Sequence, residues 1–153
     1  GIYLSAVRAL LFNQILSIRV ANGHWNKPLV GDVMMLDGSR SFFVSDTVDG
    51  EIEQRFAQFD IHASGPLWGR GALPSHADVR ALAEAPLHAR GLWCQGLEAA
   101  GLKQERRSLR LMIKQLLWQF VSDDVLRIEF ELPPGSYATT VLRELLKYSN
   151  ASI

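Results

Sequence analysis

The chain has few of the residues that form disulfides or hold metal ions. Its one cysteine, Cys94, has no partner for an internal disulfide, so a reducing cytoplasm is the expected compartment. The four histidines are scattered along the sequence, and none lies four residues from another or near Cys94. Because metal sites gather such ligands at short and regular spacings, we expect no metal site here.

The chain also lacks an excess of charge and a long apolar run. Sixteen basic and sixteen acidic residues give a formal net charge of zero, so any surface for nucleic acid has to be local. No apolar run approaches the roughly 18 residues that cross a bilayer, so no membrane partner is expected. The sequence starts at Gly1 and enters a helical pattern almost at once. We therefore expect it to be a piece of a longer polypeptide.

Two common catalytic motifs are missing as well. The stretch from His62 to Gly71 is rich in glycine, but it lacks the Gly-Lys-Ser/Thr that sits on nucleotide phosphates. We expect it to be a connecting loop. No Gly-x-Ser-x-Gly nucleophile elbow occurs, so nothing in the sequence assembles its serine, histidine and aspartate residues into a triad.

The first strong pattern that is present is an amphipathic helix at the start of the chain. Polar residues of this helix include Arg8, Asn13 and Arg19, and Asn13 lies nearly opposite the apolar stripe, where pattern alone favours a solvated side chain. Asn22-Gly23 ends the helix. The stripe consists of Leu4, Val7, Leu11, Ile15 and Ile18.

A hairpin and three further helical segments follow. Residues 33–36 and 41–44 are predicted strands joined through a turn that contains Asp37-Gly38, a strong hairpin signal. A short helix is expected over 51–59. Ser75-His76-Ala77-Asp78 resembles a capping box, and the helix that it starts should stop at Pro86. Another helix is expected from about Leu87 to Ala100, ending at Gly101.

A basic stretch lies between residues 103 and 114. Five basic residues and one acidic residue give it a local charge of plus four, in a chain that is neutral as a whole. Arg106, Arg107 and Arg110 lie in this stretch, on an expected helix. Such a run is usually a solvated face, whereas contact with RNA phosphates is the functional alternative.

The last part of the chain predicts strand, turn and helix in succession. Leu116–Phe120 and Val125–Leu132 are expected to be strands, and the second alternates apolar and charged residues. Pro133-Pro134-Gly135 ends it, and Ser136 is a suitable N-cap for the helix that follows. The fold class is therefore α+β, and the two pairs of strands should lie in two separate sheets because helical sequence divides them.

Four of these segments resemble a known family and together cover most of the chain; the expected helix with Arg106 and Arg107 is one of them. Leu132-Pro133-x-Gly135-Ser136-Tyr137-Ala138-Thr139-x-x-x-Arg143-Glu144 closely resembles the carboxy-terminal signature of the tRNA pseudouridine synthase D (TruD) family. Tyr3-Leu4-Ser5-Ala6-x-Arg8-x-x-x-Phe12-Asn13-x-x-Leu16-x-x-Arg19 resembles the start of the domain inserted in that family. Gly65-Pro66-Leu67-x-Gly69 resembles a turn within the same domain.

The resemblance implies a domain organisation and an activity. Residues 1–112 would be the inserted (TRUD) domain, a small mixed α/β unit, and residues 113–153 would be the carboxy-terminal segment of the catalytic domain. Family members convert uridine 13 of tRNA to pseudouridine, which requires the base to leave its stack. They need no cofactor and no metal. Partners are therefore tRNA and an amino-terminal catalytic half; the oligomeric state stays open.

The resemblance also implies which residues act. The family's catalytic aspartate stands in a Gly-x-Lys-Asp-Arg-like motif, and none of the aspartates here has that context, so no catalytic residue is expected in this chain. Tyr137 matches an aromatic position beside that aspartate; its alternative is packing in the core. The expected substrate-binding residues are Tyr137, Ser136, Arg143, Asn13, Arg106, Arg107 and Arg110. Two other functions remain open, a non-catalytic RNA-binding module derived from the family and a structural or interaction domain.

Overall fold

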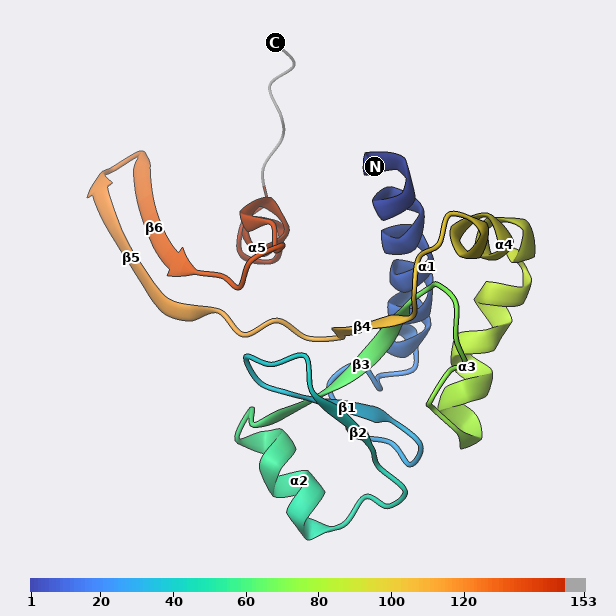
Figure 1. Cartoon of the computed structure of the whole chain (residues 1–153). Coiled ribbons are helices and arrows are strands. Elements are labelled where there is room, and N and C mark those ends of the chain that lie inside the picture. Colours follow the sequence, from blue (N-terminus) through green and yellow to red (C-terminus); the bar gives the residue numbers. More distant parts are fainter. Residues whose placement is uncertain (148–153) are drawn as a thin grey trace. The chain divides into compact units, whose positions relative to one another are not determined.

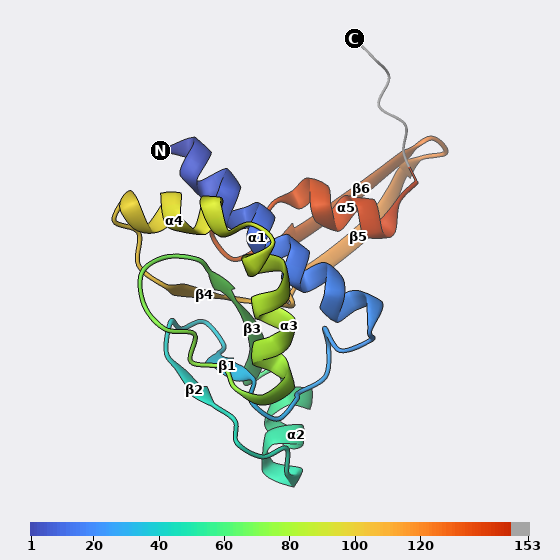
Figure 2. The ribbon, with the colours of Figure 1, turned by 90° about the vertical axis from the view of Figure 1, so that its right-hand side faces the viewer.

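The computed structural model describes residues 1–147 and divides the chain into two units, Gly1–Arg110 and Leu111–Ile153. The first unit contains a four-stranded sheet and the second a two-stranded sheet (Figures 1 and 2). The order in the first sheet is β2 (Phe42–Val44), β1 (Val33–Leu36), β3 (Ile61–Leu67) and β4 (Glu105–Ser108), and the second sheet pairs β5 (Lys114–Ser122) with β6 (Val125–Glu131). The expected α+β class and the separation of the strands into two sheets are confirmed. The domain boundary between residues 112 and 113 that the resemblance implies stays a prediction.

Helix α1, Ile2–Ala21, ends as the sequence predicts, at Asn22 and Gly23. Gly23 has a φ of 68°, the left-handed conformation that glycine adopts without strain. The Gly23 amide donates to the Val20 carbonyl at 3.0 Å, and the His24 amide donates to the Arg19 carbonyl at 2.8 Å. These two bonds form a Schellman motif, which satisfies carbonyls at the end of the helix.

One polar position of α1 is buried, contrary to the sequence pattern. The side chain of Arg19 is 2% exposed and pairs with Asp32, which is fully buried, at 2.9 Å. Its guanidinium also donates to the carbonyls of His24 and Lys27, while Asp32 accepts from the Leu29 amide. The pair therefore fixes the loop that follows α1. A buried arginine is tolerated here because its donors have acceptors.

Helix α1 also corrects the expectation that no segment could span a membrane. By length and by a mean hydropathy of 1.3 it meets the criteria for a membrane span. Core helices of soluble proteins meet the same criteria, and Leu11, Phe12 and Ile15 of α1 are buried within the first unit.

The hairpin at the start of the sheet is confirmed. Strands β1, Val33–Leu36, and β2, Phe42–Val44, are antiparallel and pair Met34 with Phe43. Gly38 in the connecting turn has a φ of 67°, as the Asp-Gly signal predicts.

Two segments of this sheet were predicted incorrectly. The expected loop at 62–71 begins as β3, Ile61–Leu67, a central strand that pairs with both β1 and β4. The expected helix around Arg106 is instead the edge strand β4, Glu105–Ser108. Gly65 allows β3 to pack closely against α1, because a Cβ at this position would lie 2.9 Å from the ring of Phe12. Glycine and proline are uncommon inside strands, so the composition of this segment did not indicate a buried strand.

The three remaining helices of the first unit agree with the sequence in part. Helix α2, Gly50–Ala57, begins one residue before the expected 51–59 and ends two residues before its end, and it is capped by the side chain of Asp49. Helix α3, Ala77–His88, continues past Pro86, and α4, Gly91–Ala99, is separate from it. The capping box is wrong, because His76 is the N-cap and makes no side-chain cap bond.

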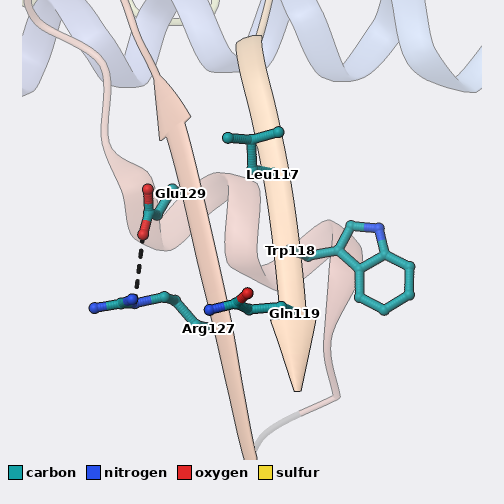
Figure 3. Close-up of a pocket in the computed structure, with 5 residues that line it drawn as sticks. All are labelled: Leu117, Trp118, Gln119, Arg127 and Glu129. Atoms are coloured by element: carbon teal, nitrogen blue, oxygen red, sulfur yellow. Dashed lines mark ion pairs between the residues drawn. The ribbon is translucent and has the colours of Figure 1, made fainter. Parts of the chain in front are cut away.

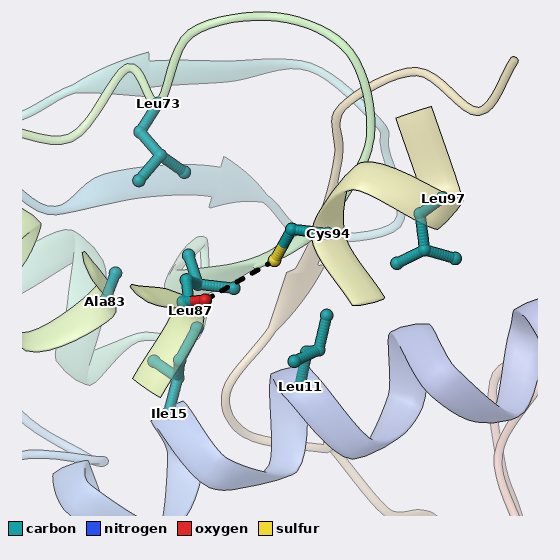
Figure 4. Close-up of a cluster of buried hydrophobic side chains, with 7 residues drawn as sticks. All are labelled: Leu11, Ile15, Leu73, Ala83, Leu87, Cys94 and Leu97. Carbon is teal, nitrogen blue, oxygen red and sulfur yellow. Dashed lines mark hydrogen bonds between the residues drawn. The ribbon is translucent and has the colours of Figure 1, made fainter. Parts of the chain in front are cut away.

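Two apolar clusters fill the first unit, and α1 contributes to both. In one of them the buried Cys94 thiol faces the Leu87 carbonyl at 3.6 Å, and burial, followed by the charge of Glu98, raises the pKa of the thiol (Figure 4). Phe12 belongs to the other cluster, with Met34, Phe56 and Ile61. The first cluster comprises Leu11, Ile15, Leu73, Ala83, Leu87, Cys94 and Leu97.

The second unit is a hairpin followed by a helix. Strands β5, Lys114–Ser122, and β6, Val125–Glu131, pair antiparallel around the predicted turn. Helix α5 is Ala138–Leu145. Each residue of β5 is exposed, so the strands that the sequence predicted have formed without a core over them.

Candidate nucleic-acid interface

The turn before α5 places Tyr137 at the start of the helix. Gly135 has a φ of 85°, and the Ser136 amide donates to the Pro133 carbonyl at 3.2 Å, which closes the turn. Tyr137, rather than Ser136, is the N-cap, and its side chain makes no cap bond. The expected N-cap is therefore displaced by one residue.

The Tyr137 side chain is 75% exposed, so within the described chain it is not a core residue. Arg143 on α5 is also exposed, whereas Ser136 is half-buried. An exposed aromatic ring can stack on a nucleobase, and an exposed arginine can meet a phosphate. These three predicted residues thus lie on one short segment of the second unit.

The β5–β6 hairpin has two chemically different faces. Trp118 pairs with Ile128, and Phe120 pairs with Leu126, so these four apolar side chains share one face. The rings of Trp118 and Phe120 pack edge to face, with their centroids 6.2 Å apart, and each residue is 67% exposed.

The other face of the hairpin is largely polar. It carries Leu117 and Gln119 opposite Glu129 and Arg127, and the last two form an exposed ion pair at 3.3 Å. Figure 3 shows the Trp118 indole pointing away from that ion pair. A hollow of about 130 Å³ lies here. It is smaller than the usual 300–1,000 Å³ of a ligand pocket, so the hairpin does not by itself enclose a nucleotide.

The three predicted arginines of the first unit lie in different environments. Arg106 points inward, where its guanidinium donates to the hydroxyl and the carbonyl of Ser64. Burial lowers the pKa of Arg106 to about 10, and the nearby Asp32 charge opposes that shift. Arg106, Arg19 and Ser75 line a cavity of about 10 Å³, which has room for about one water molecule.

Arg107, the next residue of β4, is exposed. Its guanidinium carbon lies 5.4 Å from the centroid of the Phe12 ring, which is within the range of a cation–π contact. A guanidinium in this position keeps N–H donors toward solvent. Of the three predicted arginines, Arg107 is therefore the most available to an RNA phosphate.

Arg110 is held by four acceptors from separate parts of the first unit. Its NH2 group donates to the carbonyls of Phe56 at 2.5 Å and Ile61 at 2.9 Å. Its NH1 group donates to the Asn26 side chain at 2.9 Å, and Nε donates to His62 Nδ1 at 2.9 Å. Burial lowers the pKa of this guanidinium, and the charge of Asp37 opposes that shift.

Two aromatic rings complete the surroundings of Arg110. Its guanidinium carbon lies 3.8 Å from the centroid of Phe56 and 4.3 Å from that of Phe59. Phe59 has a φ of 60°, which is rare for a bulky residue. The contact with Arg110 offsets part of that strain. Arg110, the last residue of the first unit, therefore links several of its segments.

The bond from Arg110 also selects a tautomer of His62. Arginine can only donate, so Nδ1 of His62 must accept. The ring proton is then on Nε2, which donates to Asp37 Oδ1 at 2.9 Å. His62 is 5% exposed, and this tautomer satisfies both of its neighbours.

The structure brings some of the predicted residues together and separates others. Tyr137, Ser136 and Arg143 belong to the second unit, whereas Asn13 and the three arginines belong to the first. Asn13 is exposed on α1. Among residues 1–147, no group of three or more histidine, cysteine, aspartate or glutamate side chains could hold a metal ion.

The residues that surround Arg110, among them Asn26, Phe59 and His62, were not predicted from the sequence. A bulky residue directly after a short helix, where glycine is usual, was the available signal for Phe59. No local pattern identifies Asn26 and His62, because Arg110 reaches them across 84 and 48 positions of the chain.

Comparison with known proteins gives one consistent family. The model of the tRNA pseudouridine synthase D (TruD) family matches residues 1–145. A tRNA pseudouridine synthase D of Nitrosococcus oceani is 53% identical over 152 residues, which are 99% of this chain and 42% of that protein. One from Hydrogenovibrio crunogenus is 44% identical over 147 residues, covering 96% of this chain and 42% of that protein.

A solved structure has the same fold. The crystal structure of a Methanosarcina mazei protein assigned as tRNA pseudouridine synthase D superposes with a TM-score of 0.72 at 24% identity. The superposition covers 90% of this chain and 36% of that one. The chain thus spans roughly two-fifths of the length of the curated relatives it matches.

Proposed function

Because the chain belongs to the tRNA pseudouridine synthase D family, we propose that it is part of an enzyme that isomerises uridine 13 of tRNA to pseudouridine. The observation that carries the proposal is the family match, which runs through both units to residue 145 and includes the Tyr137 turn. The rest of the polypeptide would supply the catalytic aspartate. Such an enzyme would meet its tRNA in the cytoplasm.

In this proposal Tyr137 forms part of the wall of the uridine pocket. An enzyme that acts on C5 of a uridine has to take the base out of its stack, and an aromatic side chain can replace the lost stacking. The 75% exposure of Tyr137 supports this role, because the ring has no packing of its own to give up. Ser136 and Arg143 would bind the backbone of the same nucleotide or its neighbour.

Arg107 is the leading candidate for a phosphate contact in the first unit. Its exposure and its place in a stretch of local positive charge support that role. Arg106 and Arg110 stay in the proposal, but both already donate to protein acceptors. They would have to exchange those bonds for bonds to RNA. Asn13, on the exposed side of α1, is the remaining proposed contact.

The hairpin would complete the catalytic domain. Trp118 and Phe120 expose an apolar face, and a two-stranded hairpin alone is at best marginally stable in water. We propose that the amino-terminal half of the complete protein covers this face. The hairpin would then hold the Tyr137 turn in place at the catalytic centre.

The test uses the complete gene product and the 153-residue chain side by side. Each is incubated with tRNA that carries uridine at position 13 and with a variant that carries cytidine there, and pseudouridine is mapped by sequencing. We expect conversion at position 13 by the complete product and none by the chain alone. If the complete product binds tRNA but forms no pseudouridine, it is a non-catalytic RNA-binding module. Absence of binding would favour a structural or interaction domain.

A further inference from the structure

Helix α1 carries only two charged residues, and both are turned toward the rest of the first unit. Arg8 donates to the carbonyls of Leu67 at 2.8 Å and Lys103 at 2.9 Å, and pairs with Glu105 at 3.0 Å. Arg19 forms the buried pair with Asp32. The charges of this helix are therefore used inside the unit.

The opposite face of α1 is exposed and uncharged. Its residues recur at spacings of three and four, so they form one strip along the helix. Tyr3 is 85% exposed, Leu10 is 41% exposed and Val20 is 53% exposed. We call this strip the outer face of α1, and it consists of Tyr3, Ala6, Leu10, Asn13, Ser17 and Val20.

An ordinary surface helix points its apolar stripe to the core and its charged residues to water. Helix α1 has the first feature and lacks the second, because its apolar stripe is buried while its solvent-facing strip carries no charge. We propose that the outer face of α1 docks against an uncharged protein surface in the rest of the same polypeptide. The inference rests on the proposed function only in taking the complete protein to be a longer family member. The chain covers 42% of the Nitrosococcus oceani relative, so more than half of such a protein lies outside it.

The chemistry of the outer face favours a protein over RNA or a lipid surface. RNA binding requires cations, and both arginines of α1 face inward. Helices that lie on membranes carry lysine and arginine beside their apolar face, and the outer face has neither. Asn13 and Ser17, in the middle of the strip, could hydrogen-bond across a protein interface and fix its register. In this proposal Asn13 is buried at the interface, which competes with its proposed contact to RNA.

Thiol labelling can measure whether the outer face is covered. The variants Leu10→Cys and Val20→Cys place a thiol on the outer face, and Gln54→Cys places one on exposed and charged α2 as a matched control. Cys94 gives little background because it is buried and the pKa of its thiol is raised. Each variant is labelled with a maleimide in the 153-residue chain and in the complete gene product, and labelling of each cysteine is followed by peptide mass spectrometry.

We expect Leu10→Cys and Val20→Cys to react at least about tenfold more slowly in the complete product than in the chain, while Gln54→Cys reacts equally in both. Equal rates for all three variants would overturn the proposal. Two further results, measured on the complete product, would overturn it too: self-association in sedimentation that Leu10→Glu abolishes, which identifies a second copy as the occupant, and flotation with phosphatidylglycerol vesicles that Leu10→Glu abolishes. Pseudouridine formation is measured separately, so an inactive product with a protected Leu10→Cys would refute the proposed function alone.

Discussion

The two units of the chain differ in how they use their apolar residues. In the first unit Leu11, Met34 and Ile61 are completely buried, and two apolar clusters share α1. In the second unit Trp118 and Phe120 are each 67% exposed. Both units belong to one family match, yet only the first satisfies its own hydrophobic pattern. The second has the pattern of a half-buried sheet without the layer that would bury it.

Polar groups show the same contrast. In the first unit, Arg19 and Asp32 are paired out of contact with water. In the second unit, Arg127 and Glu129 pair in the open, where an ion pair contributes about 0–1 kcal/mol. The first unit thus encloses an apolar core of its own, whereas the second leaves its apolar face open.

The largest expected effect is on independent folding. We expect residues 1–110 to unfold cooperatively in urea and residues 111–153 to show no transition, because a hairpin and one short helix cannot bury enough apolar surface. Circular dichroism and tryptophan fluorescence of the two separate polypeptides would measure this. Cooperative unfolding of the second polypeptide as a monomer would refute the contrast between the units.

The next effect concerns the two ion pairs. Asp32→Ala leaves the buried guanidinium of Arg19 without its partner, and we expect it to lower the free energy of unfolding by about 3–5 kcal/mol. Glu129→Ala, at an exposed pair of the second unit, should lower it by less than about 1 kcal/mol. Urea denaturation of the 153-residue chain gives the first value, and urea denaturation of the complete product gives the second.

The double variant Arg19→Met with Asp32→Leu is the control. It removes both charges together, so it should recover much of the stability that Asp32→Ala loses. If Asp32→Ala alone costs less than about 1 kcal/mol, the pair is better hydrated than the structure indicates.

The sequence predicted the elements whose signals are local. The end of α1 depends on Asn22-Gly23, the first hairpin on Asp37-Gly38, and the last strand on its alternating pattern. Each of these signals lies within a few residues, and the structure confirms all three elements. The two-sheet organisation followed because helical sequence separates the strands.

Elements that depend on distant contacts were predicted less well. Strand β3 contains Gly65 and Pro66 and has the composition of a loop; it is a strand because β1 and β4 pair with it on both sides. The inward turn of Arg106 likewise depends on Ser64, 42 residues earlier. In the candidate site, the residue types and the turn at Gly135 were predictable from the sequence, but the arginines that remain free of protein acceptors were not.

A smaller effect distinguishes aromatic rings in the two units. Phe12→Ala, in the core of the first unit, should cost about 3–5 kcal/mol of stability. Tyr137→Ala should leave the melting temperature of the complete product nearly unchanged and lower its turnover at uridine 13 about tenfold or more, because base stacking contributes about 1–3 kcal/mol. Tyr137→Phe keeps the ring and should retain most of the rate.

Turnover and melting temperature of each variant are measured together in the complete product. A large loss of stability in Tyr137→Ala would return Tyr137 to the core-packing alternative. The second unit would then have a buried aromatic of its own in the complete protein.

The smallest expected effect separates Arg107 from Arg106 within the first unit. Arg107→Ala should weaken tRNA binding and lower the slope of log affinity against log salt by about 0.7–0.9, the value for one lost phosphate contact. The melting temperature should stay unchanged because Arg107 is exposed.

Arg106→Ala should leave the salt slope unchanged and lower the free energy of unfolding by about 1–3 kcal/mol, since Ser64 loses its bonds to the guanidinium. Filter binding of tRNA at four salt concentrations gives the salt slope, and urea denaturation gives the free energy of unfolding. An unchanged salt slope in Arg107→Ala would mean that Arg107 contacts only solvent, and the first unit's contact with tRNA would have to lie elsewhere.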